Sequence, residues 1–103
     1  MSEAFSVLEI LEQLYRRGYT EDFRVIGQNM RLIPANVLID PEYLIVDDIY
    51  RFEGYTDLGD EAVIFALSCP KNNLKGTYLV AYGPMMDIAD SHMVQKLSYF
   101  YPR

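Results

Sequence analysis

The fold is decided by the stretch from Asp47 to Gly83, which reads DDIYRFEGYTDLGDEAVIFALSCPKNNLKGTYLVAYG. It contains three apolar runs rich in β-branched and aromatic residues, at Ile49–Tyr55, Ala62–Cys69 and Gly76–Tyr82. Short polar segments rich in Asp, Asn, Gly and Pro separate these runs. Runs of this length with turn residues between them are typical of consecutive antiparallel strands. The sequence therefore predicts an antiparallel sheet as the centre of the protein.

The order of side chains along the first run assigns its two faces. Tyr50 and Phe52 share one face and Arg51 and Glu53 the other, because successive strand residues point in opposite directions. We therefore expect Tyr50 and Phe52 to be buried and Arg51 and Glu53 to be exposed. The second run, Ala62–Cys69, is apolar on both faces, which indicates a strand in the middle of the sheet.

A helix with signals at both ends precedes the sheet. Ser6 and Glu9 have the spacing of a capping box, in which each side chain accepts a free backbone N–H of the first turn. Apolar residues then recur at helical spacing, and Gly18 is a typical left-handed stop. The sequence predicts a helix over Val7–Arg17.

A second helical pattern lies near the end of the chain. Either Asp90 or Ser91 can cap this helix, and Pro102 ends it. Its apolar stripe consists of Met93, Val94, Leu97 and either Phe100 or Tyr101.

The pattern is weaker between the first helix and the central strands. Phe23–Ile33 predicts one strand at a sheet edge, bulged at Gly27, because Arg24, Gln28 and Arg31 interrupt the apolar residues without a clean period of two. A short ambiguous segment and a proline turn follow it.

Together these elements predict an α+β protein. Its core is a small antiparallel sheet of about four strands, with an N-terminal helix and a short C-terminal helix that we expect on one face of the sheet. A chain of 103 residues is long enough for one core, so a single α+β domain over residues 1–103 is expected.

Composition argues against several classes of function. The formal net charge of −6 is opposite in sign to the basic surface that nucleic acids require. The lone cysteine, Cys69, allows neither an internal disulfide nor a cysteine-based zinc site. No apolar run approaches the roughly 20 residues of a membrane span, and Glu3 without a basic region around it is unlike a secretory signal. We expect a cytoplasmic protein without a cofactor that binds neither nucleic acid nor membranes.

Three phrases of the sequence resemble a known family. They are RGYTEDF from Arg17, DDIYRFEG from Asp47, and the glycine-containing segments around Gly76 and Gly83. Over nearly its whole length the chain resembles a family of short, uncharacterised bacterial proteins that are often labelled phosphoribosylpyrophosphate synthetase. The resemblance implies a bacterial protein with a phosphoribosyl or nucleotide ligand.

Two acids and a glycine-containing segment are the residues that fit this label. Enzymes that use phosphoribosyl pyrophosphate carry an apolar strand, two acids, and a loop rich in Thr and Gly that cradles the 5′-phosphate. In this chain Asp47 and Asp48 follow an apolar run, and Gly54 begins a segment with a threonine. Glu53 would place a carboxylate beside that phosphate. Asp47 and Asp48 should also face opposite ways unless the strand ends or bulges there.

The residues themselves favour another function. The chain has nine tyrosines, a residue type that is enriched at protein interfaces. We expect a small non-catalytic interaction module that binds a protein partner or itself; the alternative is an enzyme or binder of a phosphoribosyl or nucleotide ligand. No catalytic, cofactor-binding or metal-binding residue is predicted. The candidate ligand or partner contacts are Asp47, Asp48, Arg51, Glu53 and Tyr55.

Overall fold

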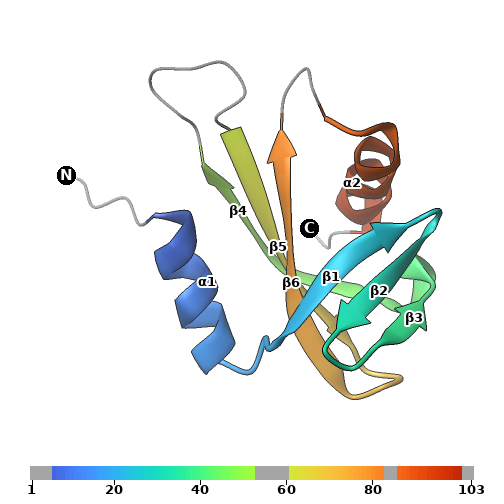
Figure 1. Ribbon diagram of the computed structural model, residues 1–103, viewed down its shortest axis with the longest axis horizontal. Helices are drawn as coiled ribbons and strands as arrows, with labels where there is room; N and C mark the ends of the chain where they lie inside the picture. The colour runs from blue at the N-terminus through green and yellow to red at the C-terminus, as the bar shows by residue number, and fades with distance from the viewer. Residues whose placement is uncertain (1–5, 53–60, 83–85, 101–103) are drawn as a thin grey trace.

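A twisted sheet with one helix on each side forms the protein (Figure 1). The computed structural model describes residues 6–52, 61–82 and 86–100. The α+β class predicted from the sequence is confirmed. In chain order the described elements are α1 (Val7–Arg16), β1 (Glu21–Ile26), β2 (Asn29–Ile33), β3 (Val37–Ile39), the short 3₁₀ helix η1 (Pro41–Tyr43), β4 (Ile45–Phe52), β5 (Glu61–Cys69), β6 (Leu74–Tyr82) and α2 (Ile88–Phe100).

The sheet is larger than expected and is mixed. Its six strands have the order β3-β2-β1-β6-β5-β4, where about four antiparallel strands were predicted. The strands β1–β2–β3 and β4–β5–β6 form two antiparallel meanders. A short parallel pairing of β1 with β6 joins the meanders, with Glu21 beside Gly76 and Asp22 beside Thr77.

The prediction of a single bulged strand over residues 23–33 was wrong, because the chain reverses direction at Gly27 and Gln28. Ile26 pairs with Asn29, which leaves Gly27 and Gln28 as a two-residue hairpin loop. Gly27 has a φ of 61°, as the first central residue of a type II′ turn requires, and this turn matches the natural twist of a hairpin. The interruptions in the apolar pattern therefore mark a turn between β1 and β2.

The helices lie on opposite faces of the sheet, which corrects the expectation that they share one face. In α1, Ile10 and Leu14 pack with Tyr19 and with Ile64 and Ala66 of β5. On the other face, α2 contributes to the larger core. That core contains Phe23, Met30, Leu32, Ile39, Leu44, Val46, Val63, Phe65, Leu67, Cys69, Tyr78, Val80, Met93, Val94 and Leu97.

The central strands lie where the sequence predicts, but two of their aromatic side chains are less buried than expected. Strand β5 lies between β6 and β4 and is buried on both faces, as its sequence predicts. Tyr50 and Phe52 point toward α1 but are only half-buried, because β4 is an edge strand. Arg51 is exposed as expected, and Glu53 lies outside the described residues.

The two helices differ in how well their starts were predicted. The capping box at α1 is confirmed: the Glu9 N–H donates to Ser6 Oγ at 3.1 Å, and the Ser6 N–H donates to Glu9 Oε1 at 2.8 Å. Helix α2 begins at Ile88, ahead of the predicted caps Asp90 and Ser91, which both lie inside its first turn. The Ser91 N–H already bonds to the carbonyl of Asp87 at 2.9 Å, so neither predicted cap residue is a helix end.

The capping box gives a direct test of the N-terminal helix. We expect Ser6→Ala to lower the free energy of unfolding by about 1 kcal/mol, because a first-turn N–H loses its acceptor. Chemical denaturation measures this change. The matched control is Ser98→Ala, at an exposed position inside α2, where alanine should be neutral or slightly stabilising. An equal loss in both variants would contradict the capping argument.

Candidate functional site

A β-bulge at Asp47 brings the two neighbouring acids of β4 onto one face of the sheet. Val46 pairs with Leu67 and Asp48 pairs with Ala66, so Asp47 is an extra residue between two successive pairs. Asp48 shares the face of Ala66, which is the α1 face, since directly opposite residues of a sheet point the same way. Asp47 and Asp48 were expected to share a face only if the strand ended or bulged between them, and this bulge meets that condition.

Asp47 holds the segment after α1 against the sheet. Its Oδ2 atom accepts two hydrogen bonds, from the Tyr19 hydroxyl and from Ser68 Oγ, both at 2.9 Å. The Tyr19 ring lies 4.8 Å from Lys75 Nζ and 5.6 Å from the Arg17 guanidinium carbon. Burial raises the pKa of Tyr19, and the hydrogen bond to Asp47 raises it further. These contacts assign Asp47 a role in anchoring Tyr19.

The structure describes three of the five predicted contact residues, Asp47, Asp48 and Arg51, and it does not bring these three together. Asp48 Oδ1 accepts the N–H of Ile49 at 2.9 Å, which is a local backbone contact. Arg51 pairs with Val63 and so points to the α2 face, away from the two acids. Glu53 and Tyr55 lie outside the described residues. Among the described members of the predicted set, Asp47 and Asp48 share a face and Arg51 does not.

A second buried hydroxyl joins β6 to α2. The Tyr78 hydroxyl donates to Asp90 Oδ1 at 2.5 Å, and the Tyr78 ring stacks on Phe65 with their centroids 5.8 Å apart. Burial raises the pKa of Tyr78 well above its ordinary value, and the hydrogen bond and negative charge of Asp90 add to the shift. The neutral phenol is therefore the form that the folded protein favours.

The raised pKa of Tyr78 predicts how stability changes in alkali. The pKa of Tyr78 in the folded protein lies above its value near 10 in the unfolded chain. The Tyr78 hydroxyl therefore makes its full contribution to the free energy of unfolding below about pH 10, and this contribution is lost progressively as the pH rises further. Tyr78→Phe should cost about 1–2 kcal/mol at neutral pH by leaving Asp90 unpaired, and its stability should fall less steeply in alkali than that of the parent. Denaturant titrations at neutral and alkaline pH measure both effects. The control is Tyr15→Phe, at an exposed position, which should keep the free energy of unfolding of the parent at neutral pH.

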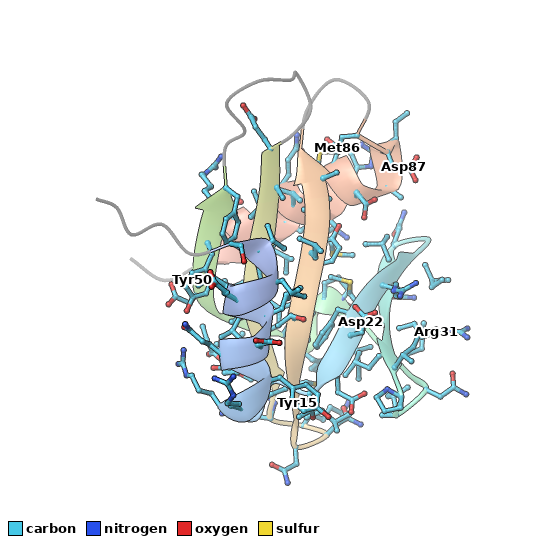
Figure 2. All side chains as sticks on the ribbon, turned by 60° about the vertical axis from the view of Figure 1, so that its left-hand side comes forward. Tyr15, Asp22, Arg31, Tyr50, Met86 and Asp87 are labelled. Atoms are coloured by element: carbon cyan, nitrogen blue, oxygen red, sulfur yellow. The ribbon has the colours of Figure 1, made fainter. Side chains whose placement is uncertain are left out.

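The outer side of the β1–β2–β3 meander is not covered by either described helix (Figure 2). Alternate residues of these strands point into the α2 core, so the intervening residues point the other way. We call this surface the open face. It consists of Asp22, Arg24 and Ile26 of β1, Arg31 and Ile33 of β2, and Leu38 of β3, all of them exposed except the half-buried Asp22.

Two arginines lie directly opposite each other on the open face. Arg24 of β1 pairs in register with Arg31 of β2, and like charges that lie directly opposite each other destabilise a sheet. Asp22 accepts from Arg24 Nη2 at 2.8 Å and from Arg24 Nε at 3.0 Å. Within the part of the chain that the structure describes, the side chain of Arg31 forms no hydrogen bond or ion pair. One carboxylate thus offsets only one of the two cations.

A groove continues the open face toward α1. It has a volume of about 360 Å³ and reaches from Leu11 and Tyr15 of α1 to Asp22 of β1, with Thr77 and Leu79 of β6 between them. Tyr15 and Leu79 are 62% and 45% exposed, so large apolar side chains line it without being covered. Asp22 belongs to both the groove and the open face, which makes them one continuous surface.

Sequence reasoning missed this surface because it treated β1 and β2 as a single strand. A signal was present: Arg24 and Arg31 lie symmetrically about Gly27-Gln28, so a two-residue hairpin loop there places them opposite each other. The glycine was interpreted as a bulge, and the two arginines were therefore not placed side by side.

Comparison with known proteins adds no functional assignment. The chain matches no family model, no curated protein and no solved structure. Neither described helix is long and apolar enough to cross a membrane. Among residues 6–52, 61–82 and 86–100, no three His, Cys, Asp or Glu side chains are grouped so that they could hold a metal ion.

Proposed function

We propose that this protein is a small non-catalytic interaction module that binds a protein partner through the open face and the adjoining groove. The observation that carries the proposal is an uncovered sheet face on which exposed Ile33 and Leu38 border two opposed arginines. Arginine and aromatic side chains are enriched at protein interfaces, and the core of an interface is more apolar than the rest of the protein surface.

Charge favours a different protein over a second copy as the partner. A two-fold dimer brings the same patch of both copies together. On the open face this would set Arg24 and Arg31 against the same two arginines, with Asp22 already bonded to Arg24. A heterologous partner avoids this repulsion.

The proposal places the module in the cytoplasm. Support comes from the buried thiol of Cys69, which lies 3.4 Å from its acceptor Asn72 Oδ1. A buried thiol of this kind is a structural core residue, and free thiols persist in reducing compartments.

The test compares two exposed aliphatic positions. A partner isolated from the native cell is purified and titrated against the parent chain, Leu38→Thr on the open face, and Ile88→Thr on α2. Both residues are more than half exposed, so both variants should keep the parent melting temperature. We expect Leu38→Thr to weaken binding about tenfold and Ile88→Thr to leave it unchanged. Equal affinity of the parent and Leu38→Thr would show that the open face is not the docking surface.

The alternative function is binding of a phosphoribosyl or nucleotide ligand, and the bulge that puts Asp47 and Asp48 on one face is the observation that favours it. Asp47 Oδ2 is already bonded to the hydroxyls of Tyr19 and Ser68, which favours an anchoring role. Calorimetric titration with phosphoribosyl pyrophosphate and Mg²⁺ should therefore give no heat of specific binding. Binding that disappears in Asp48→Asn, with unchanged melting, would establish the alternative instead.

A further inference from the structure

We infer that the partner presents an acidic segment, in which carboxylates lie next to apolar side chains, and that Arg31 and Arg24 bind those carboxylates. This inference rests on the proposed function and names the chemistry of its partner. It follows from the charge of the open face, the order of its residues across the strands, and the groove beside it.

The charge of the open face differs from that of the whole chain. The chain has a formal net charge of −6. The open face, in contrast, carries two arginines and a single acid, Asp22. The side chain of Arg31 extends at the outer edge of the view in Figure 2, on the side of the sheet where Asp22 also lies. A partner carboxylate placed over Arg24 and Arg31 would neutralise the positive charge that Asp22 leaves uncompensated. The planar guanidinium group of arginine binds carboxylates with two parallel hydrogen bonds.

Residue order across the meander determines which neighbours such a carboxylate must have. Arg24, Arg31 and Leu38 lie in one row across β1, β2 and β3. Ile33 lies two residues from Arg31 on the same strand face, opposite Asp22. A partner segment that places an acid over the two arginines therefore places its neighbouring side chains over Leu38 and Ile33. Apolar side chains fit best at those two positions. An acidic segment with alternating or closely spaced leucines has this pattern.

The groove extends the same recognition toward α1. Leu79 and Tyr15 line a hollow that begins at Asp22, so a segment leaving the arginine pair can place a large apolar side chain there. Asp22 at the junction is bonded to Arg24 and is thus shielded from the incoming acid.

Polyanions other than an acidic protein segment fit the surface less well. Nucleic acids and anionic membranes need an extended array of cations. The open face has two cations, and the rest of the chain is acidic overall. A short acidic segment needs only this local pair.

The experiment uses two labelled synthetic peptides of the same length, one of alternating Glu and Leu and one of alternating Lys and Leu, measured by fluorescence anisotropy. We expect the Glu–Leu peptide to bind and the Lys–Leu peptide not to bind. Arg31→Gln should lower the affinity for the Glu–Leu peptide about tenfold and should reduce the salt dependence of the binding. The matched control is Lys96→Gln, which removes an exposed cation from α2 and should leave the affinity unchanged.

The outcomes separate this inference from the proposed function. Failure of the Glu–Leu peptide to bind, or equal binding to the parent and Arg31→Gln, would overturn the acidic partner. If both peptides bind and Leu38→Thr lowers the affinity for both, the open face is a docking surface, but the inferred preference for an acidic partner is wrong. Binding of phosphatidylserine vesicles or a single-stranded oligonucleotide that depends on Arg31 and exceeds that of the peptide would also overturn the inference.

Discussion

The substitution Gly76→Ala is expected to lower the free energy of unfolding by about 3 kcal/mol or more, at the upper end of what overpacking costs. A Cβ atom at Gly76 would overlap the carbonyl oxygen of Glu21 and would lie 2.6 Å from its carbonyl carbon. These are backbone atoms of the neighbouring strand, so no side-chain rotation can relieve the clash. The strands β1 and β6 would have to separate at the pairing that joins the two meanders.

Gly27→Ala is the matched control for this effect. No heavy atom lies within 4 Å of a Cβ built at Gly27, so only its φ of +61° opposes the substitution, at a cost of about 1–2 kcal/mol. Denaturant unfolding of both variants gives the comparison, and loss of folding in Gly76→Ala alone agrees with the prediction. A Gly76→Ala protein as stable as the parent would mean that β1 and β6 do not approach each other this closely.

The second large effect concerns the separate cores on the two faces of the sheet. Leu14 of α1 is 1% exposed and Leu97 of α2 is fully buried, so truncation of either to alanine should cost about 2–5 kcal/mol. The two residues belong to different clusters with the sheet between them. We therefore expect the losses to add within about 0.5 kcal/mol in the double variant Leu14→Ala/Leu97→Ala.

Additivity distinguishes two cores from one. Helices packed side by side on one face would share contacts, and the double variant would then depart from the sum by more than about 0.5 kcal/mol. Where the double variant is too unstable to measure, the milder pair Leu14→Val and Leu97→Val gives the same comparison with smaller cavities. Strong coupling in either pair would contradict the two-faced arrangement.

Elements with a local chemical signal could be predicted from the sequence. The capping box of Ser6 and Glu9 satisfies backbone groups within one helical turn, so its signal does not depend on the rest of the fold. The strand β5 is apolar on both faces and takes its central position from that composition. Such features are readable because neighbouring residues alone produce them.

The side of the sheet on which each helix packs has no local signal. It is set by contacts between distant parts of the chain, such as those of Ile10 and Leu14 in α1 with Ile64 and Ala66 in β5. The candidate site was missed for a related reason. A single glycine can mark a bulge or a hairpin loop, and the choice at Gly27 decides whether Arg24 and Arg31 lie one behind the other or side by side.

The two acids were found from the sequence, although their arrangement was not. The bulge at Asp47 occurs where the carboxylate can accept the hydroxyls of Tyr19 and Ser68. Tyr19 is far from Asp47 in sequence, so no periodicity within β4 indicates this contact.

The short parallel pairing also determines how the protein can open and fold. Each meander is built from strands that are consecutive in the chain, whereas Glu21 and Gly76 are separated by more than half of it. Closing so long a loop is slow compared with forming hairpins, so the meanders should form first and dock afterwards. Amide hydrogen exchange during refolding would then show protection of the hairpins before protection of the pairing at Gly76. A partner that contacts Arg24 of β1 and Leu79 of β6 at once would span both meanders, and its binding would slow the opening of the pairing between them.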